Sequence, residues 1–199
     1  MPKYAKPLVF LICLLPLAML AWDGFHDALG ANPIEKITHR TGDWSLRFLL
    51  ITLSVTPLRL LFGWKQLIRF RRMLGLFAFF YVSLHFSIYI VFDHFFDVNE
   101  IAKDIVKRPY VTVGFTAFLL LIPLAITSTN KMMKRLGNRW KQLHQLVYVI
   151  AVLGVLHYLW LVKADILQPV IHAVVLLILL GIRAWHQRKE MMSSVSAVW

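Results

Sequence analysis

Three histidines are placed where they could bind a metal-containing cofactor inside a membrane. His144 and His157 lie thirteen residues apart in an apolar stretch, residues 140–160. On a helix that rises ~1.5 Å per residue, they are roughly 20 Å apart along the axis. His85 lies in a second apolar stretch, thirteen residues after Arg72. Because an imidazole is costly in hydrocarbon, each of these side chains needs a partner. A neutral imidazole nitrogen is a common ligand for a transition metal.

The composition indicates that membrane helices hold these histidines. The chain has 199 residues, 59% of them hydrophobic, and its mean hydropathy is +0.65. Soluble domains have an apolar share of about 45–50%. We predict an all-α integral membrane protein, a bundle of six transmembrane helices that forms one domain over residues 1–199. The expected spans are residues 5–22, 44–62, 73–92, 110–127, 142–162 and 166–184.

The segments between the spans carry most of the charge. Residues 23–43 read as a polar connection with a short helix after the Asn32-Pro33 turn, residues 93–109 as an acid-rich loop, and residues 163–165 as a short turn with Lys163 and Asp165. The side of the membrane that holds both termini has 15 Lys and Arg against one acid, Glu190, whereas the other side has 7 against nine acids. Basic short loops stay cytoplasmic, which places both termini inside. The net charge of +12 is therefore mainly a topology signal and does not indicate nucleic-acid binding.

Several kinds of site are absent from the sequence. No G-x-G-x-x-G or G-x-x-x-x-G-K-[ST] motif is present, so a soluble nucleotide-dependent partner must be a separate chain. Cys13 is the single cysteine and cannot form an internal disulfide. There is no C-x-x-C-H, which excludes a covalently attached c-type haem. We find no internal sequence repeat.

The depths of the histidines predict how they pair. The third and fifth spans run in the same direction, so residues can be compared by counting from the start of each span. His85 and His157 share a depth in the outer half and could ligate one iron from opposite sides, as in a non-covalent b-type haem. The same count places Arg72, and no histidine, opposite His144. An inner haem would be five-coordinate on His144 or have a different sixth ligand; alternatively, His144 serves a quinone or a flavin.

The other histidines have simpler interpretations. His26, His39, His94 and His186 are expected to be solvated loop residues, and His172, inside the sixth span, to form a hydrogen bond across helices. Interhelical hydrogen bonding is also the alternative to iron ligation for His85, His144 and His157. Aromatic residues near these histidines could pack on a macrocycle or face lipid: Phe77, Phe79, Phe80, Tyr81, Phe86, Tyr89, Tyr148, Tyr158 and Trp160.

Four segments carry a resemblance to a known family. They are LGANPIEKITHRTG, RRMLGLFAFFYVSLHFSIY, KRPYVTVGFTAFLLLIPLAITST and LGNRWKQLHQLVYVIAVLGVLHYLW. From about Leu8 to Arg183 the chain resembles the MsrQ (YedZ) family, haem-binding membrane subunits of protein-methionine-sulfoxide reductase systems within the ferric-reductase-like transmembrane group.

The resemblance implies a function. A member of this family lies in the bacterial inner membrane and carries one or two b haems. It takes electrons from the quinone pool or a cytosolic flavin donor and passes them to MsrP, a periplasmic molybdopterin enzyme that reduces methionine sulfoxide. FMN is also associated with the family. The resemblance assigns His85 and His157 as a haem pair and His144 as a second-haem ligand. It makes the chain an electron-transfer subunit of an oxidoreductase, without catalytic residues of its own.

Two alternatives remain at this point. The chain could be a free-standing ferric or quinone reductase haem domain. From a different class, it could be a small transporter whose histidines relay protons or bind a metal. The spans contain few carboxylates and show no duplicated halves, which argues against a transporter.

Overall fold

The computed structural model describes residues 4–162 and 166–196, and every regular element in this part of the chain is helical. The predicted turn at Lys163 and Asp165 lies outside the described residues. The α-helices are α1 (Ala5–Phe25), α2 (Pro33–Phe62), α3 (Ile68–Ile88), α4 (Val98–Lys107), α5 (Pro109–Ile126), α6 (Asn130–Leu136), α7 (Asn138–His144), α8 (Leu146–Leu161) and α9 (Leu167–Ser196). A 3₁₀ turn, η1 (Lys65–Leu67), precedes α3, and a π-helical turn, η2 (Tyr89–Asp93), follows it.

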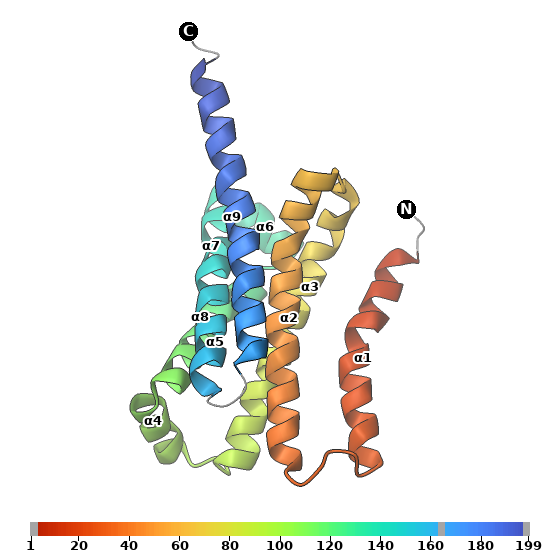
Figure 1. The fold of residues 1–199 in the computed structure, drawn as a ribbon, viewed down its shortest axis with the longest axis vertical. Coiled ribbons are helices and arrows are strands. Elements are labelled where there is room, and N and C mark those ends of the chain that lie inside the picture. The colour runs from red at the N-terminus through yellow and green to blue at the C-terminus, as the bar shows by residue number, and fades with distance from the viewer. Residues whose placement is uncertain (1–3, 163–165, 197–199) are drawn as a thin grey trace.

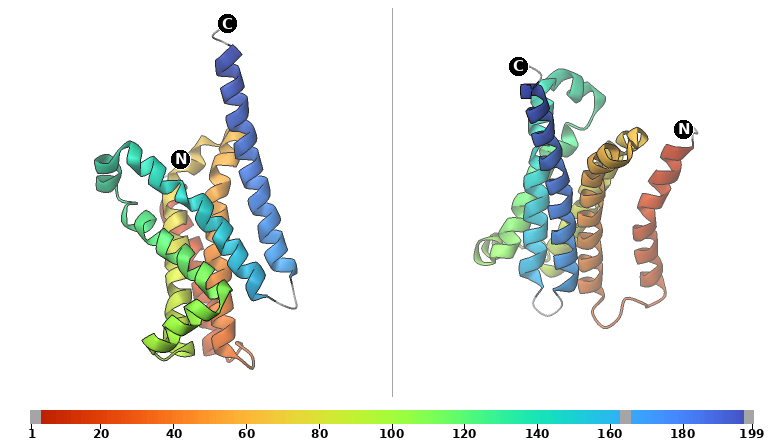
Figure 2. Two further views of the ribbon diagram at one scale, coloured as in Figure 1. Left: turned by 90° about the vertical axis from the view of Figure 1, so that its left-hand side faces the viewer. Right: turned by 45° about the horizontal axis from the view of Figure 1, so that its top comes forward.

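Within the part of the chain that the structure describes, six helical segments are long and apolar enough to cross a membrane, which confirms the predicted six-helix membrane fold. They are Ala5–Phe25, Pro33–Phe62, Lys65–Asp93, Pro109–Ile126, Asn138–Leu161 and Leu167–Ser193. Both ends of the chain lie at the same end of the bundle (Figure 1). The last part of α9 projects beyond the other helices at that end (Figure 2).

The second helix begins earlier than the sequence pattern predicts. Residues 33–43 are the first turns of α2, where we expected a polar connection with only a short helix. Asn32 caps this start, since its side chain accepts a hydrogen bond from the backbone N–H of Glu35, and Pro33 occupies a first-turn position that needs no N–H donor. The helix therefore begins before the apolar stretch. Its first, polar turns contribute residues to the large cavity described below.

The predicted loop at residues 93–109 also contains a helix. Asp97 caps α4 by accepting hydrogen bonds from the N–H groups of Asn99 and Glu100. The expected basic loop after α5 contains the two short helices α6 and α7. The apolar stripe of α4, Val98, Ile101, Ala102 and Ile105, belongs to a helix of only ten residues, and α6 and α7 are shorter still, so the charged composition of these segments favours loops over helices.

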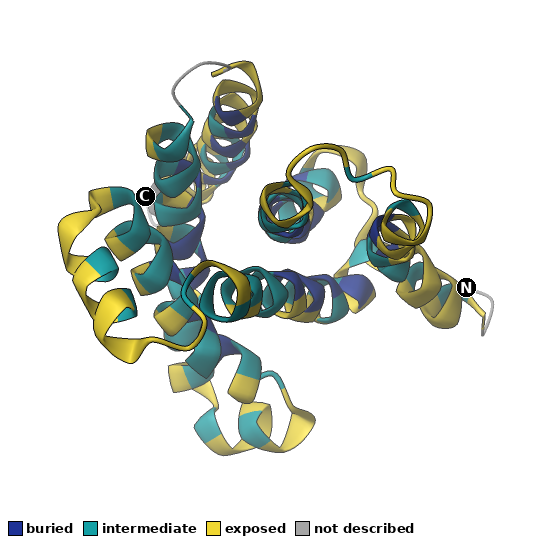
Figure 3. Cartoon of the chain, turned by 90° about the horizontal axis from the view of Figure 1, so that it is seen from below, coloured by how far each residue is buried: buried dark blue, intermediate teal, exposed yellow. Residues whose placement is uncertain are grey.

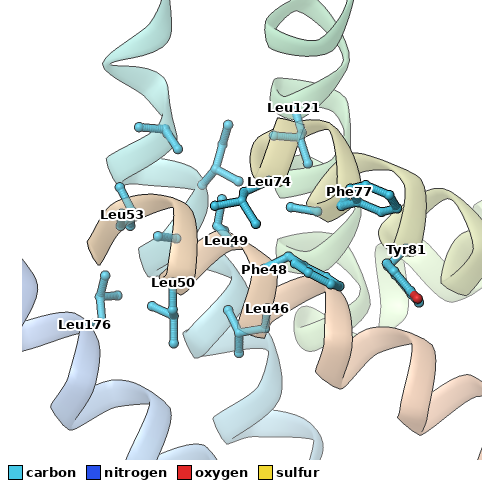
Figure 4. Close-up of a cluster of buried hydrophobic side chains, with 14 of the residues drawn as sticks. Leu46, Phe48, Leu49, Leu50, Leu53, Leu74, Phe77, Tyr81, Leu121 and Leu176 are labelled. Carbon is cyan, nitrogen blue, oxygen red and sulfur yellow. The ribbon is translucent and has the colours of Figure 1, made fainter. Parts of the chain in front are cut away.

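Two helix pairs form the centre of the bundle, α2 with α3 and α5 with α8, and α9 packs on α2 and α8. The buried side chains face the interior, whereas the outward faces are exposed (Figure 3). Leu53 and Ala151 are completely buried. The core around them is aliphatic on the α9 side and aromatic toward α1, where Phe48, Phe77 and Tyr81 pack together (Figure 4).

The peripheral helix α1 is attached through Tyr81. The Tyr81 hydroxyl donates to the carbonyl of Cys13 at 2.9 Å and accepts from the N–H of Leu17 at 3.2 Å. These two backbone groups are one helical turn apart, so the hydroxyl is inserted into the hydrogen-bond ladder of α1. Tyr81 therefore has a structural role, and it is not among the residues that line the large cavity described below.

Arg183 satisfies a carbonyl that Pro57 leaves without its helical donor. Pro57 has no N–H, so the Leu53 carbonyl one turn earlier has no partner within α2. The Nη2 of Arg183 donates to that carbonyl at 2.6 Å, and its Nη1 donates to the Tyr148 hydroxyl. Arg183 is 8% exposed although it is charged.

This arrangement predicts a rescue experiment. Arg183→Leu should destabilise the protein by about 1–3 kcal/mol, because it leaves a buried carbonyl unsatisfied. Pro57→Ala supplies the missing N–H, so the double variant should recover part of that loss. Thermal unfolding in detergent of the wild type, both single variants and the double variant measures the coupling. Strictly additive effects would contradict the explanation.

Candidate functional site

A cavity of about 570 Å³ opens between the two central helix pairs. This volume is within the usual range for cofactor sites. Its walls come from α2, α3, α5 and α8, and both His85 and His157 line it. The deeper wall is apolar, with Leu46, Leu49 and Leu121 among its members, whereas charged side chains gather at the outer end of α2 and near α4.

The His85 ring is held against α2. Its Nδ1 donates to the carbonyl of Thr38 at 2.9 Å. A carbonyl only accepts, so this bond places the proton on Nδ1 and leaves Nε2 with a free lone pair. Gly42 makes room for the ring, because a Cβ at this position would lie 3.1 Å from Nδ1 and 3.2 Å from Cε1.

The His157 ring is held against α5 in the same way. Its Nδ1 donates to the carbonyl of Tyr110 at 2.7 Å. Gly114 is the residue that allows this approach, since a Cβ there would lie 2.6 Å from Nδ1 and 2.9 Å from Cε1. Carbonyl partners of this kind orient metal-ligating imidazoles and raise their basicity.

The two halves of the cavity use equivalent positions. Each histidine is 47 residues after the residue whose carbonyl it bonds, and each glycine is one helical turn after that carbonyl. A constant offset of 72 residues relates Thr38 to Tyr110, Gly42 to Gly114 and His85 to His157. The same offset pairs other lining residues: Leu46 with Phe118, Leu49 with Leu121, Ala78 with Ile150, Val82 with Gly154, and Phe86 with Tyr158. Few of these pairs are identical, which explains why the sequence shows no repeat.

The spacing of the two rings fits a shared metal ion. Their centroids are 6.2 Å apart and their planes meet at 79°. Two metal–imidazole bonds of about 2.0–2.1 Å, plus ~1.1 Å from each nitrogen to its ring centre, separate opposed imidazoles by roughly 6.2–6.4 Å. The equal depth expected for His85 and His157 from the sequence therefore agrees with the structure. The free nitrogens, the glycine cradles and the cavity volume all suit a haem-sized cofactor.

A polar network closes the outer mouth of the cavity. The carboxylate of Asp104 accepts from the Tyr89 hydroxyl at 3.0 Å and from Nε of Arg108 at 2.8 Å, and it lies 3.5 Å from Nε2 of His94. The hydrogen bond to the Tyr110 hydroxyl raises the pKa of Arg108, which keeps its positive charge at the mouth. Asp104 thus ties α4 to the end of α3.

His144 lies apart from this cavity. It ends α7, its Nδ1 donates to the Trp140 carbonyl at 3.1 Å, and its ring stacks on Trp140 at 3.9 Å. Its Nε2 is buried without a hydrogen-bond partner. Arg72, which the 72-residue offset places opposite His144, is exposed and donates to the side-chain oxygen of Asn130. The structure therefore does not bring a second histidine to His144.

The structure corrects the interpretation of two other histidines. His94 was expected to be solvated, but its side chain is 13% exposed and packs on Tyr89. His39 is exposed, as expected, although it lies in α2 and also lines the cavity. His172 was expected to bond across helices, but its Nδ1 donates to the carbonyl of Gln168 in its own helix. Sequence reasoning also missed Gly42 and Gly114, whose signal was their shared position relative to the two histidines.

The predicted aromatic surroundings are present in part. Of the residues singled out in the sequence, Phe86, Tyr89 and Tyr158 line the cavity. Phe115 and Phe118 of α5 complete this aromatic wall, and both pack on Phe86. These two residues could not be assigned from the sequence, because α5 contains no histidine that would mark it as a wall of the site.

Fold and site together define a multi-pass helical membrane protein with a paired-imidazole cavity between two equivalent helix pairs. A family model described as "Ferric reductase like transmembrane component" matches residues 41–155, which include α3, α5 and His85 and end two residues before His157.

Relatives that match almost the whole chain show which family of these membrane proteins it belongs to. A protein of Herminiimonas arsenicoxydans is 59% identical over 191 residues, covering 93% of this chain and 88% of the relative. Proteins of Xanthomonas euvesicatoria pv. vesicatoria and Xanthomonas oryzae pv. oryzae are each 54% identical over 187 residues, covering 91% of this chain and 86% of the relative. All three are named "Protein-methionine-sulfoxide reductase heme-binding subunit MsrQ". The chain belongs to the MsrQ family within the ferric-reductase-like transmembrane proteins.

Proposed function

We propose that the chain is a b-type-haem electron-transfer subunit of a methionine sulfoxide reductase system. It passes electrons from the quinone pool or a cytosolic flavin reductase to MsrP, a periplasmic molybdopterin enzyme with which it forms a heterodimer. That enzyme repairs oxidised periplasmic proteins. The observation that carries this proposal is the pair of rings, His85 and His157, set 6.2 Å apart in one cavity.

The chain contributes ligands and a low-polarity cage. Nε2 of His85 and Nε2 of His157 would hold the haem iron, and Thr38 and Tyr110 hold the rings in the ligating tautomer. A bound haem supplies one-electron chemistry between ferric and ferrous iron. The chain itself does not reduce methionine sulfoxide, so that reaction belongs to the partner enzyme.

The proposal also includes a second haem, in the inner half of the helix bundle. His144 is proposed as the ligand of a second, inner haem, because its buried Nε2 lacks a partner in the protein. FMN is a further proposed cofactor on the strength of the family, and no residue of this chain is assigned to it.

The distribution of basic residues between the two ends of the bundle indicates how the chain is oriented in the membrane. The end of the bundle that holds the termini also carries the basic loops, so we place it in the cytoplasm and the cavity mouth at the periplasmic face of the bacterial inner membrane. This orientation puts the paired histidines on the side where MsrP would accept electrons.

Haem per polypeptide tests the proposal. A pyridine haemochrome assay on detergent-purified wild type should give at least one b haem per chain, and His144→Ala should remove one haem of two while the outer haem stays. One haem in both proteins would confine iron to His85 and His157 and remove the inner haem from the proposal. No haem in wild type from cells supplied with haem precursor would overturn the electron-transfer function.

A further inference from the structure

A second hollow lies on the flank of the bundle, between α2 and α9. It has a volume of about 370 Å³ and is lined by Trp44, Arg47, Leu50, Ile51, Ile171, His172 and Val175. Ile51 and Ile171 on its rim are 43% and 44% exposed, in segments that cross the membrane. A ligand therefore enters it from the hydrocarbon and must be soluble in lipid.

Two polar groups interrupt this otherwise apolar groove. Arg47 is three residues into the apolar part of α2, and its guanidinium lies over the Trp44 ring at 5.0 Å from the centroid. A charged side chain at this position is costly unless it has a function or a partner. His172 is 6% exposed, and because its Nδ1 donates to the Gln168 carbonyl at 2.7 Å, Nε2 is left as an acceptor. The groove thus presents a cationic donor and a neutral imidazole acceptor.

The charge at the groove favours a neutral ligand. Nη2 of Arg47 lies 3.9 Å from the carboxylate of Asp43, which offsets the positive charge. A phosphate would be repelled by this carboxylate, whereas a neutral carbonyl oxygen can accept a hydrogen bond from the guanidinium. A hydroxyl on the same ligand can donate to Nε2 of His172. A ring beside Trp44, one carbonyl or hydroxyl at each end and an apolar tail describe a quinone or quinol.

The groove is one side chain away from the paired-histidine cavity. The ring of His172 packs edge-on against Tyr158, with centroids 5.7 Å apart. Tyr158 also lines the cavity and follows His157 directly in the chain. Asp43, the partner of Arg47, lines the cavity as well. Both polar groups of the groove therefore contact residues that surround the proposed outer haem.

We propose that the α2–α9 groove binds the headgroup of a membrane quinol, with Arg47 and His172 as its hydrogen-bonding residues, and that electrons enter the outer haem from there. This inference rests on the proposed function, because it needs a haem in the neighbouring cavity. Oxidation of one quinol to the quinone releases two electrons, which reduce two ferric irons to ferrous in successive steps. It also releases two protons, one from the hydroxyl at Nε2 of His172, which takes it up, and one from the hydroxyl at Arg47, which passes to the carboxylate of Asp43, 3.9 Å from Nη2 of Arg47.

Anaerobic stopped-flow reduction tests the groove. Haem-loaded protein is mixed with a short-chain quinol, and the rise of the ferrous haem band is followed in wild type, Arg47→Met and Ile171→Trp. The first variant removes the donor, and the second fills the groove from an exposed position on its rim. We expect the initial rate with quinol to fall at least about tenfold in both, in Arg47→Met because a hydrogen bond to a charged group is lost, and in Ile171→Trp because the added ring blocks the groove. Reduction by dithionite and haem per polypeptide should stay at the wild-type values.

Matched controls separate the groove from general effects of substitution. Arg40→Met removes another arginine of α2, which pairs with Asp23 outside the groove. Leu177→Trp adds the same bulk to α9 at a position that is 69% exposed and is not part of the groove. Both should keep the wild-type quinol rate. If Arg47→Met does not fold, Ile171→Trp still decides the question, because it leaves every polar contact in place.

Three results would overturn this inference. Quinol rates at the wild-type level in both groove variants would place quinol entry elsewhere. Wild type that is reduced by dithionite but not by quinol would remove the quinol site and leave the haem proposal intact. Retention of an anionic phospholipid by wild type and not by Arg47→Met, with unchanged quinol rates, would assign the groove to a lipid headgroup. Failure of the proposed function itself is distinguished by absence of haem from the wild type.

Discussion

Replacing either His85 or His157 by alanine is expected to abolish the six-coordinate haem of the outer cavity. The two side chains occupy equivalent positions and, in the proposed site, each would supply one nitrogen to the haem iron, so the two variants should lose haem to the same extent. Loss of a carboxylate or carbonyl behind a ligating imidazole costs roughly 10–100-fold in metal affinity, and loss of the ligand itself should cost at least about 100-fold. Haem per polypeptide and the low-spin absorption spectrum measure the effect.

The vacated space offers a direct control on this result. Free imidazole should restore the low-spin spectrum in His85→Ala and His157→Ala, because the cavity remains and only the tethered ligand is gone. His26→Ala, which changes an exposed histidine directly after the end of α1, should keep the wild-type spectrum. A six-coordinate haem in either cavity variant without added imidazole would show that the pair does not form the outer axial ligands.

Gly114→Ala should cause nearly as large a loss through a single methyl group. The new Cβ would lie 2.6 Å from Nδ1 of His157, closer than real Cβ contacts allow, so the ring must leave the Tyr110 carbonyl. Gly42→Ala should act in the same direction but less strongly, since its Cβ would lie 3.1 Å from Nδ1 of His85. We expect haem content to follow the order Gly181→Ala, Gly42→Ala, Gly114→Ala, from highest to lowest.

The free energy of unfolding of the apoprotein should not follow the order of haem content in these three variants. Alanine is favoured over glycine in a helix by about 1 kcal/mol, which offsets part of the cost of displacing the His157 ring in Gly114→Ala, so the apoprotein should remain folded in all three variants. Gly181 has open space where its Cβ would be and serves as the neutral reference on α9. Wild-type haem content in Gly114→Ala would refute the close approach of the His157 ring to α5.

The sequence by itself was sufficient for the membrane fold and for the histidine pair. Long apolar runs specify spanning helices because no other element except a closed barrel satisfies its backbone in lipid. Regular helices also convert residue counts into depth, which is why His85 and His157 could be matched before any coordinates were considered. Family-specific segments of sequence carried the resemblance that the comparisons confirmed.

Other features depended on contacts between segments that are distant in sequence, and only the tertiary structure decided them. The start of α2 at Pro33 matters because Thr38 and Gly42 meet His85, a contact that no local pattern encodes. The burial of His94 against Tyr89 reflects the packing of α4. Arg183 reads as a basic residue near a helix end, yet it satisfies the carbonyl freed by Pro57. Hydropathy locates a helix along the membrane normal, but the azimuth of each side chain, and so its partner, is set when the helices pack together.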